Sequence, residues 1–295
     1  MFDRLYPGMP WGSYRDRWPL AEASRFVVAG GRTWHVQISG QGPCLLLLHG
    51  TGSGSFSWRG LIPILSRHFR VVAPDLPGHV FTTRGATDGL SLNGMSDGLC
   101  ALIRQLNLQP SVLVGHSAGA AIAANMVLRD DTLSTAHLIG MNPAWLPLPG
   151  LSTWLFGPAA KLAAINPLSA WATAKLAKRP SFLAKSLAQT GSVLSEEGMA
   201  LYQTVFSHSG HVHSVLGMMA AWQLAPLSDA LARIKNPVSI FVGLNDQTIP
   251  PALAEQACKV MPQAVLHQQP QLGHLAHEER PEASANAVLS ACGVI

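Results

Sequence analysis

The chain has 295 residues, of which 48% are hydrophobic and only 12% are Asp, Glu, Lys or Arg, and its formal net charge is +4. This length can bury a substantial core without disulfides, and the composition excludes a disordered chain and a mini-protein. No stretch reaches the roughly 18 consecutive apolar residues that a membrane-spanning helix needs, and no Lys/Arg run of about five to eight residues indicates a nucleic-acid partner.

The first residues and the cysteines bear on the cellular compartment. Residues 1–23 form a leader with charges and prolines where a secretory signal would have about 7 to 15 consecutive apolar residues. The four cysteines are scattered and form no CxxC pair: Cys44, Cys100, Cys258 and Cys292. We therefore expect a cytoplasmic protein with free thiols, no zinc site and no cofactor.

The first part of the chain alternates short strands with helices. Residues 25–39 predict two strands around Ala29-Gly30-Gly31. The apolar runs at 44–48 and 70–73 each end in a Gly- and Pro-containing loop, which is typical of strands buried on both faces. Apolar residues at helical spacing predict a helix between them, over 58–68.

The alternation continues with helices over 92–106 and 117–129 and with strands over 112–114 and 138–141. After an interruption it resumes in two strands and a closing helix, at 238–242, 264–266 and 281–289. Strands that alternate with helices of this length predict an α/β fold with a mostly parallel, doubly wound sheet.

The interruption, residues 145–228, differs in character from the rest of the chain. Five basic and two acidic residues give it a net charge of +3, which is most of the charge of the chain. We expect a helical cap over this range, inserted into a core formed by residues 1–144 and 229–295. Repeated prolines and four of the eight tryptophans mark the cap: Trp145, Trp154, Trp171 and Trp222.

The sharpest chemical signal is the run Gly115-His116-Ser117-Ala118-Gly119. This G-x-S-x-G directly follows an apolar strand and directly precedes an Ala-rich helix, which is the context in which the motif forms a nucleophile elbow. Side chains two positions before and after the serine would collide in so tight a turn, so glycines are needed there. The alternative is a turn of small residues that merely packs a helix closely against a strand.

A serine hydroxyl becomes nucleophilic only when a neighbouring base takes its proton, and a third group must orient that base. Asp246 and His274 each follow a predicted strand, so both are expected at the same edge of the parallel sheet as Ser117. With twelve histidines in the chain, His274 alone could be a surface residue. Its place after Asp246 favours a catalytic triad, because serine, acid and histidine in this order are a known arrangement.

The glycine-rich loop His49-Gly50-Thr51-Gly52 follows the first long apolar strand. We expect the backbone N–H groups of Thr51 and Ala118 to form an oxyanion hole, in which each donor contributes roughly 3 kcal/mol to the transition state. A nucleotide-binding loop is the alternative. It is disfavoured because Ser55 replaces the third glycine of GxGxxG and no GK[ST] follows.

Five residues near this constellation are candidate substrate contacts. Some flank the motifs, and others lie in the cap, where Met and Trp side chains would form an adaptable apolar wall. Core packing is the alternative for the cap residues. The candidates are His49, His116, Trp145, Met218 and Trp222.

Other polar clusters are less specific. His208, His211 and His213 could bind a metal, but no carboxylate lies near them, so surface or packing roles are favoured and we expect no metal site. His277–Glu279 are expected to be charges favoured at a helix N-terminus, and Asp75 is expected to hold the loop after its strand.

On these residues the chain resembles the α/β-hydrolase superfamily, from about Ser24 onward. LLLLHGTG, VVAPDLPGH, VGHSAG, VGLNDQTIP and LGHLAHEERPE match its landmark segments in order and spacing. Within the superfamily, SRFVVAGGRTWHVQ, VLVGHSAGAAIAANM and HVHSVLGMMAAW look like the magnesium-chelatase accessory proteins of bacteriochlorophyll biosynthesis.

The resemblance implies an α/β-hydrolase fold with a helical cap inserted after the sixth strand. It also implies Ser117 as nucleophile, His274 as base, Asp246 as orienting acid, the oxyanion donors named above, and an association with magnesium chelatase. One departure is Val80, which stands where PDLPGHG would have a final glycine. Since a β-branched residue disfavours positive φ, we expect this loop to differ near the pocket.

Three functions stay open at this point. The first is a serine hydrolase that cleaves an ester or related acyl bond of an apolar, anionic substrate such as a tetrapyrrole. The second is a non-catalytic porphyrin carrier or chaperone that presents pigment to chelatase subunits, and the third is a generic carboxylesterase. Lys175, Lys178 and Arg179 near Trp171 would also allow contact with the photosynthetic membrane, although a solvated helix surface is the simpler interpretation.

Overall fold

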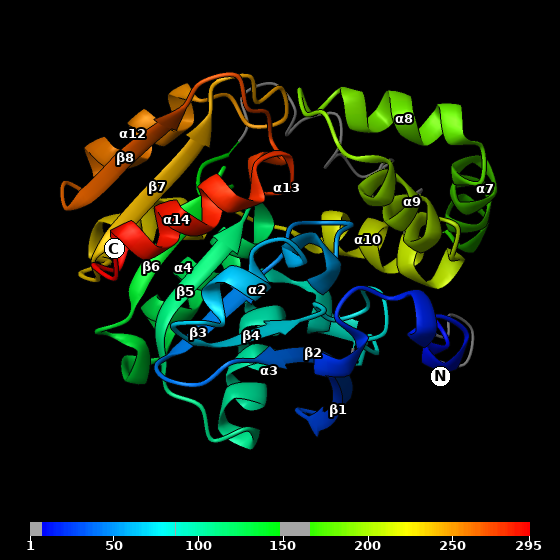
Figure 1. The fold of residues 1–295 in the computed structure, drawn as a ribbon, viewed down its shortest axis with the longest axis horizontal. Helices are drawn as coiled ribbons and strands as arrows, with labels where there is room; N and C mark the ends of the chain where they lie inside the picture. The colour runs from blue at the N-terminus through cyan, green and yellow to red at the C-terminus, as the bar shows by residue number, and fades with distance from the viewer. Residues whose placement is uncertain (1–7, 86, 148–165) are drawn as a thin grey trace.

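The computed structural model describes residues 8–85, 87–147 and 166–295 (Figure 1). An eight-stranded sheet crosses it in the order β1-β2-β4-β3-β5-β6-β7-β8. Its strands are β1 (Ser24–Ala29), β2 (Arg32–Ser39), β3 (Cys44–Leu48), β4 (Arg70–Pro74), β5 (Pro110–His116), β6 (His137–Met141), β7 (Val238–Gly243) and β8 (Ala264–Gln269).

The sheet is antiparallel at one end and parallel over the rest, which confirms the predicted α/β class. β1 pairs with β2, and β2 with β4, in antiparallel fashion, whereas the pairs from β4 through β3, β5, β6 and β7 to β8 are parallel. A parallel sheet is covered on both faces, so its strands need continuous apolar runs. Accordingly, every residue of β3 (CLLLL) and of β7 (VSIFVG) is buried.

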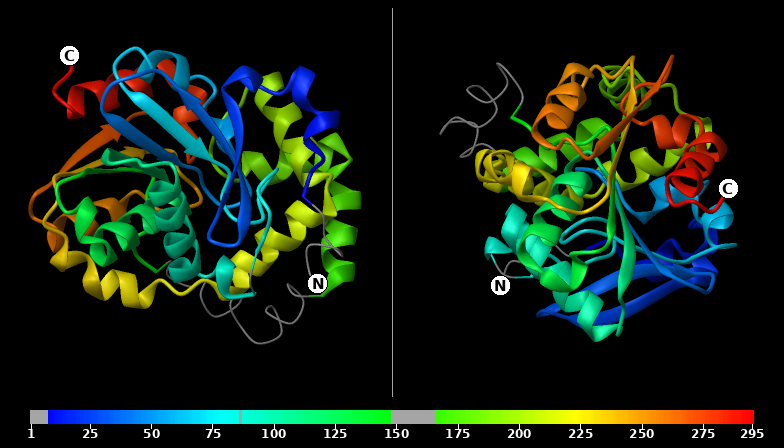
Figure 2. Two further views of the ribbon diagram at one scale, coloured as in Figure 1. Left: turned by 90° about the horizontal axis from the view of Figure 1, so that it is seen from below. Right: turned by 90° about the vertical axis from the view of Figure 1, so that its left-hand side faces the viewer.

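Helices cover both faces of the sheet, as Figure 2 shows. On one face lie α3 (Leu92–Gln105), α4 (Ala118–Arg129) and α12 (Ala252–Val260), whose apolar side chains join one core cluster. On the other face, α2 (Ile62–Leu65) and α14 (Pro281–Ala291) join a second cluster. The short helix α13 (Ala276–Glu279) precedes α14.

The chain between β6 and β7 is helical where it is described. Figure 1 shows α7 (Pro167–Ala177), α8 (Pro180–Ala188), α9 (Glu196–Phe206) and α10 (Ser209–Ala221) grouped on one side of the molecule. Trp145, which follows β6, belongs instead to the core beside the sheet, and so does Leu227 of α11 (Ala225–Ala230). The division into a core and a cap over 145–228 stays a prediction, and residues 148–165 of that range, which include Trp154 and Lys161, lie outside the described part of the chain.

The helix predicted over 58–68 is shorter in the structure. A 3₁₀ helix covers Ser55–Trp58, and α2 begins only at Ile62. Pro63 lacks an N–H group, so it suits the first turn of a helix and not its interior. Among the described residues, the structure contains no helix long and apolar enough to cross a membrane.

Candidate active site

Ser117 stands in a sharp turn between β5 and α4. Its φ of 52° and ψ of −118° are unusual for a residue with a side chain, and its N–H donates to the carbonyl of Met141 at 3.0 Å. A Cβ atom on Gly115 would lie 2.4 Å from the Cα of Ala120, and one on Gly119 would lie 2.1 Å from the Leu48 carbonyl oxygen. Both glycines are therefore required sterically, as the sequence indicated.

Asp246 and His274 are paired at the same edge of the sheet. The His274 Nδ1 donates to Asp246 Oδ2 at 2.7 Å. The second carboxylate oxygen of Asp246 accepts from the backbone N–H groups of Thr248 and Ile249 at 2.7 and 2.8 Å. Because Nδ1 is occupied by Asp246, any proton exchange by His274 must occur at Nε2.

Asn142 is a member of this arrangement that the sequence reasoning missed. Its Nδ2 donates to the same Asp246 oxygen that accepts from His274, at 2.8 Å. Asn142 directly follows β6, so the strand-end argument that led to Asp246 would also have found it. Four hydrogen bonds to the buried Asp246 carboxylate fix its orientation.

A cavity of about 320 Å³ lies above the elbow and contains both Ser117 and His274 in its lining. Thr51 and Ala118, the predicted oxyanion donors, line it as well. As the first residue of α4, Ala118 has no carbonyl within its helix to accept its N–H. The remaining wall is mainly apolar and includes Leu187, Phe206, Met218, Met219, Trp222 and Ile249.

Three of the five candidate substrate contacts reach this cavity and two do not. His116, Met218 and Trp222 line it. His49 is fully buried and bonds the backbone at both ring nitrogens, while the Trp145 indole donates to the Ala120 carbonyl in the core. The positions of His49 and Trp145 therefore do not support the expectation that they contact substrate, because both side chains are buried and hydrogen-bonded to the backbone.

With this geometry established, comparison with known proteins places the chain in a family. A family model described as the alpha/beta hydrolase family matches residues 45–287. The chain belongs to the alpha/beta hydrolase family.

Individual relatives agree with this membership. Over 274 residues the chain is 35% identical to the magnesium-chelatase 30 kDa subunit of Rhodobacter capsulatus, covering 92% of this chain and 95% of that one. Over 265 residues it is 25% identical to the 2-hydroxy-6-oxo-6-phenylhexa-2,4-dienoate hydrolase of Burkholderia cepacia, covering 84% and 87%. The solved structure of the epoxide hydrolase CorEH matches with a TM-score of 0.75 at 24% identity, over 92% of this chain and 98% of that one.

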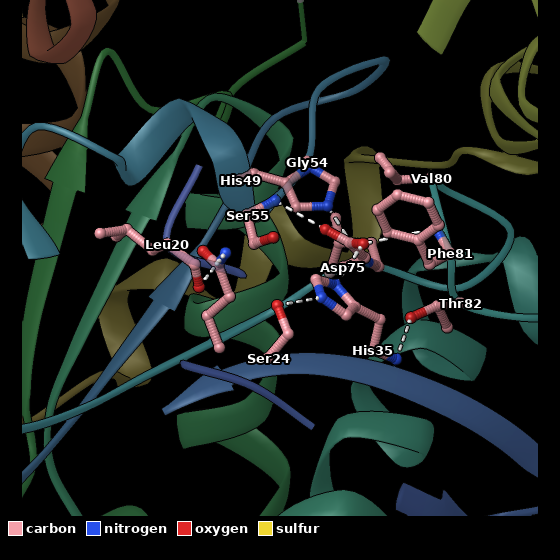
Figure 3. A network of polar contacts seen from close by, with 12 residues as sticks. Leu20, Ser24, His35, His49, Gly54, Ser55, Asp75, Val80, Phe81 and Thr82 are labelled. Atoms are coloured by element: carbon pink, nitrogen blue, oxygen red, sulfur yellow. Dashed lines mark hydrogen bonds and ion pairs between the residues drawn. The ribbon is translucent and has the colours of Figure 1, made fainter. Parts of the chain in front are cut away.

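In this alpha/beta hydrolase chain, Asp75 holds the loop that follows β4, as expected (Figure 3). Its Oδ1 accepts from the Ser55 N–H at 2.7 Å, and its Oδ2 lies 2.8 Å from Nδ1 of His35. Phe81 adds a longer N–H bond to Oδ2. Burial alone would raise the pKa of Asp75, but the attraction of His35 and the hydrogen bonds from His35 and Ser55 outweigh it and lower the pKa.

His277 is not a helix-terminal charge, contrary to expectation. It is buried, with its ring 4.4 Å from that of His116 and 4.6 Å from that of Trp58. Burial lowers the pKa of His277 to about 3, so the ring is neutral at pH 7. The side chain of Glu278 is also buried, where it pairs with Arg59 at 2.7 Å and accepts from the Tyr202 hydroxyl at 2.7 Å.

Two of the three histidines considered as metal ligands, His208 and His211, bond different protein groups. His208 bonds the Tyr14 hydroxyl, whereas His211 bonds the backbone of Gly52 and Val80. Among the described residues, the structure contains no group of three His, Cys, Asp or Glu side chains able to hold a metal ion.

Val80 adopts the conformation that its β-branched side chain was expected to avoid. Its φ is 49°, in the left-handed region, so the prediction for this residue was wrong. The strain, of order 1–3 kcal/mol, is held by the surroundings. The Val80 N–H donates to Nδ1 of His211 at 3.1 Å, and its side chain is buried against Gly54.

The segment after α8 contributes contacts that sequence reasoning also missed. The carbonyl of Thr190, just after α8, accepts from the N–H groups of His274 and Gln247 at 3.1 and 3.3 Å. A Cβ on Gly191 would lie 1.9 Å from the Asn245 carbonyl oxygen. The end of α8 is thus packed directly on the two loops that carry Asp246 and His274, and no pattern in the sequence indicated this.

Proposed function

We propose that the chain is a serine hydrolase that cleaves an ester or related acyl bond, with Ser117 as nucleophile, His274 as base and Asp246 as orienting acid. The observation that carries the proposal is the His274–Asp246 pair, whose 2.7 Å bond lies beside the cavity that Ser117 and His274 both line. Membership of a family with many hydrolase relatives agrees with it.

The reaction would proceed in two balanced steps. Ser117 Oγ attacks the acyl carbon while its proton passes to Nε2 of His274, and the resulting oxyanion accepts the N–H groups of Thr51 and Ala118. His274 then returns the proton to the leaving alcohol, which departs and leaves an acyl-serine. Water gives a proton to His274 and attacks the acyl-serine, and the bond from the acyl carbon to Ser117 Oγ then breaks. His274 passes the proton to Ser117 Oγ, which releases the acid and regenerates the Ser117 hydroxyl.

The substrate that we propose is an apolar, anionic small molecule related to tetrapyrroles. The likeness to a relative named as a magnesium-chelatase subunit supports a role as accessory factor in bacteriochlorophyll biosynthesis, with chelatase subunits as partners. The cavity, about 320 Å³, is at the small end of ligand pockets. It favours entry of one ester-bearing substituent over enclosure of a whole macrocycle.

Contact with the cytoplasmic face of the photosynthetic membrane is part of the same proposal. On α7, Trp171 is 57% exposed, and the Lys175 ammonium lies 5.0 Å from the centre of its ring. Exposed Trp beside Lys suits an anionic lipid surface. The wild-type protein should co-sediment with vesicles that contain anionic lipid. Less protein should sediment when the lipid is neutral or when the protein carries Trp171→Ser. Equal sedimentation in all three cases would contradict the membrane contact.

The second candidate function is a non-catalytic porphyrin carrier. The name of the R. capsulatus relative, a chelatase subunit and not a hydrolase, favours it. A bacteriochlorophyll-producing strain that carries only Ser117→Ala distinguishes the two. Loss of pigment supports the hydrolase, whereas normal pigment supports the carrier. Normal pigment in a strain that lacks the whole protein would exclude both pigment roles, and a generic carboxylesterase would be the remaining function.

A further inference from the structure

The loop after β3, residues Gly50–Gly54, is here called the oxyanion loop because it carries Thr51. It passes very close to the elbow: a Cβ on Gly50 would lie 2.8 Å from Nδ1 of His116 and 3.1 Å from Cβ of Ser117. With three glycines in five residues, the loop has little intrinsic preference for one conformation. One backbone bond lies within it, from the Ser53 N–H to the Gly50 carbonyl at 3.2 Å, and further bonds from outside the loop add to the orientation of its peptide groups.

Three buried histidines bond this loop through its backbone. His49 Nδ1 donates to the Gly50 carbonyl at 2.8 Å. His79 Nε2 accepts the Gly52 N–H at 3.2 Å, and His211 Nε2 donates to the Gly52 carbonyl at 3.2 Å. These atoms belong to three consecutive peptide groups, 50–51, 51–52 and 52–53, so each group is bonded by a different histidine.

The second nitrogen of each ring is also bonded to backbone, which defines the tautomers. His49 Nε2 accepts the Leu76 N–H at 2.8 Å, and His211 Nδ1 accepts the Val80 N–H at 3.1 Å. His79 Nδ1 donates to the Pro77 carbonyl at 3.1 Å. Each ring therefore needs one protonated and one unprotonated nitrogen, and burial keeps it neutral by lowering its pKa, to about 3 for His211.

The bond from His49 bears most directly on the oxyanion hole. The Gly50 carbonyl and the Thr51 N–H are the two ends of one planar peptide group and point in opposite directions. A hydrogen bond to the carbonyl thus sets the direction of the N–H. If this peptide rotated, the Thr51 donor would turn away and an oxygen would take its place.

His211 differs from the other two because it lies on α10, which also lines the cavity. His211, Ser214 and Met218 form one stripe of this helix, since residues three, four and seven apart share a face, and Trp222 follows directly after its last residue, Ala221. The Thr51 hydroxyl donates to the Met218 sulfur at 3.7 Å, and Met218 and Trp222 line the cavity. The same face of α10 therefore contacts both the oxyanion loop and the space for the substrate.

We propose that His49, His79 and His211 are positioning residues that each orient one of three consecutive peptide groups of the oxyanion loop, and that His211 makes this orientation depend on helix α10. The effect of this orientation on catalysis rests on the proposed hydrolase function. The effect on the structure, an ordered oxyanion loop, is independent of that function.

Paired substitutions test the proposal, because Asn places its polar atoms near the Nδ1 position of histidine and Gln near the Nε2 position. His211→Gln keeps the donor to Gly52, whereas His211→Asn loses it and keeps the Val80 bond. At His49 the roles reverse: His49→Asn keeps the donor to Gly50 and His49→Gln loses it. The matched control is His208→Gln, at the N-cap of the same helix but bonded to Tyr14.

Two readouts are needed, hydrolysis of p-nitrophenyl butyrate and hydrogen exchange of the Gly52 amide by NMR. We expect His211→Asn and His49→Gln to lower kcat about tenfold or more with KM within about twofold, and their partners to restore most of kcat. The Gly52 amide should exchange faster in the two impaired variants. The control should match wild type in both measurements.

A loss of kcat that follows stability and shows no Asn/Gln reversal would overturn the proposal, as would unchanged Gly52 exchange in His211→Asn. If wild type hydrolyses no ester, the proposed function fails instead. The exchange measurement then still decides whether the histidines orient the loop.

Discussion

The Nδ1 of His274 lies 2.7 Å from Oδ2 of Asp246, and the same carboxylate oxygen accepts from the side chain of Asn142 at 2.8 Å. This bond gives His274 one tautomer and one ring orientation, which a general base requires. In Asp246→Asn, the amide can donate to Nδ1 and so favours the wrong tautomer. We expect kcat for p-nitrophenyl butyrate to fall by on the order of 10³–10⁴ with a similar KM. A loss below about tenfold would contradict the assignment.

Asn142 should matter through Asp246 and not through the substrate. Asn142→Ala removes one of the hydrogen bonds to the buried carboxylate and should reduce kcat about 3- to 15-fold, equivalent to roughly 0.7–1.6 kcal/mol. The pH profile of kcat/KM should shift with it, since the carboxylate that supports His274 is less stabilised. An unchanged profile with reduced thermal stability would instead indicate a purely structural side chain.

The steric need for glycine at the elbow is testable by stability alone. Gly119→Ala would place a methyl group 2.1 Å from the Leu48 carbonyl oxygen, so β3 or α4 must move. We expect the free energy of unfolding, measured with urea, to fall by roughly 3 kcal/mol or more. Gly12→Ala is the matched control, because no atom lies within 4 Å of its added methyl group. Equal stability of the two variants would refute this account of the motif.

Acid should destabilise the protein through its buried histidines. Burial lowers the pKa of both His211 and His277 to about 3, while the unfolded chain protonates them near the ordinary value of 6.5. The folded state therefore binds fewer protons between these values, and the free energy of unfolding falls as the pH drops below 6.5.

Each such histidine should contribute a loss of about 1.4 kcal/mol per pH unit inside that window. Urea unfolding of wild type and of His277→Gln, compared at several pH values, measures this contribution: the variant should show the shallower dependence. Identical pH dependence in the two proteins would show that His277 is protonated in the folded state.

The strands and the placement of Ser117, Asp246 and His274 at one edge of the sheet could be predicted because apolar runs and the residues that follow them are local properties of the sequence. Apolar runs such as CLLLL are needed wherever a strand is buried on both faces, and a polar residue directly after such a run lies at the carboxyl edge. Ser117 follows β5 directly, and Asp246 and His274 lie in the loops that follow β7 and β8, so all three belong to this edge. Asn142 also directly follows an apolar strand, β6, so the same rule places it at this edge.

The directions of side chains could not be predicted in the same way. His49 directly precedes Gly50 and Thr51, which line the cavity, but its ring bonds the backbone of Leu76, 27 residues away. Val80 has a positive φ and bonds His211, 131 residues away. His277 is buried because Trp58 and His116 cover it. Such distant contacts decide whether a residue faces the cavity or the core, and no periodicity encodes them.

The central claim is that Ser117 is an activated nucleophile, and a fluorophosphonate probe tests it most directly. Intact-mass and peptide analysis of the treated protein should show one adduct, on Ser117, that is absent in Ser117→Ala and strongly slowed in His274→Ala. A folded wild-type protein that takes up no probe on Ser117, or that is labelled equally well without His274, would contradict the account.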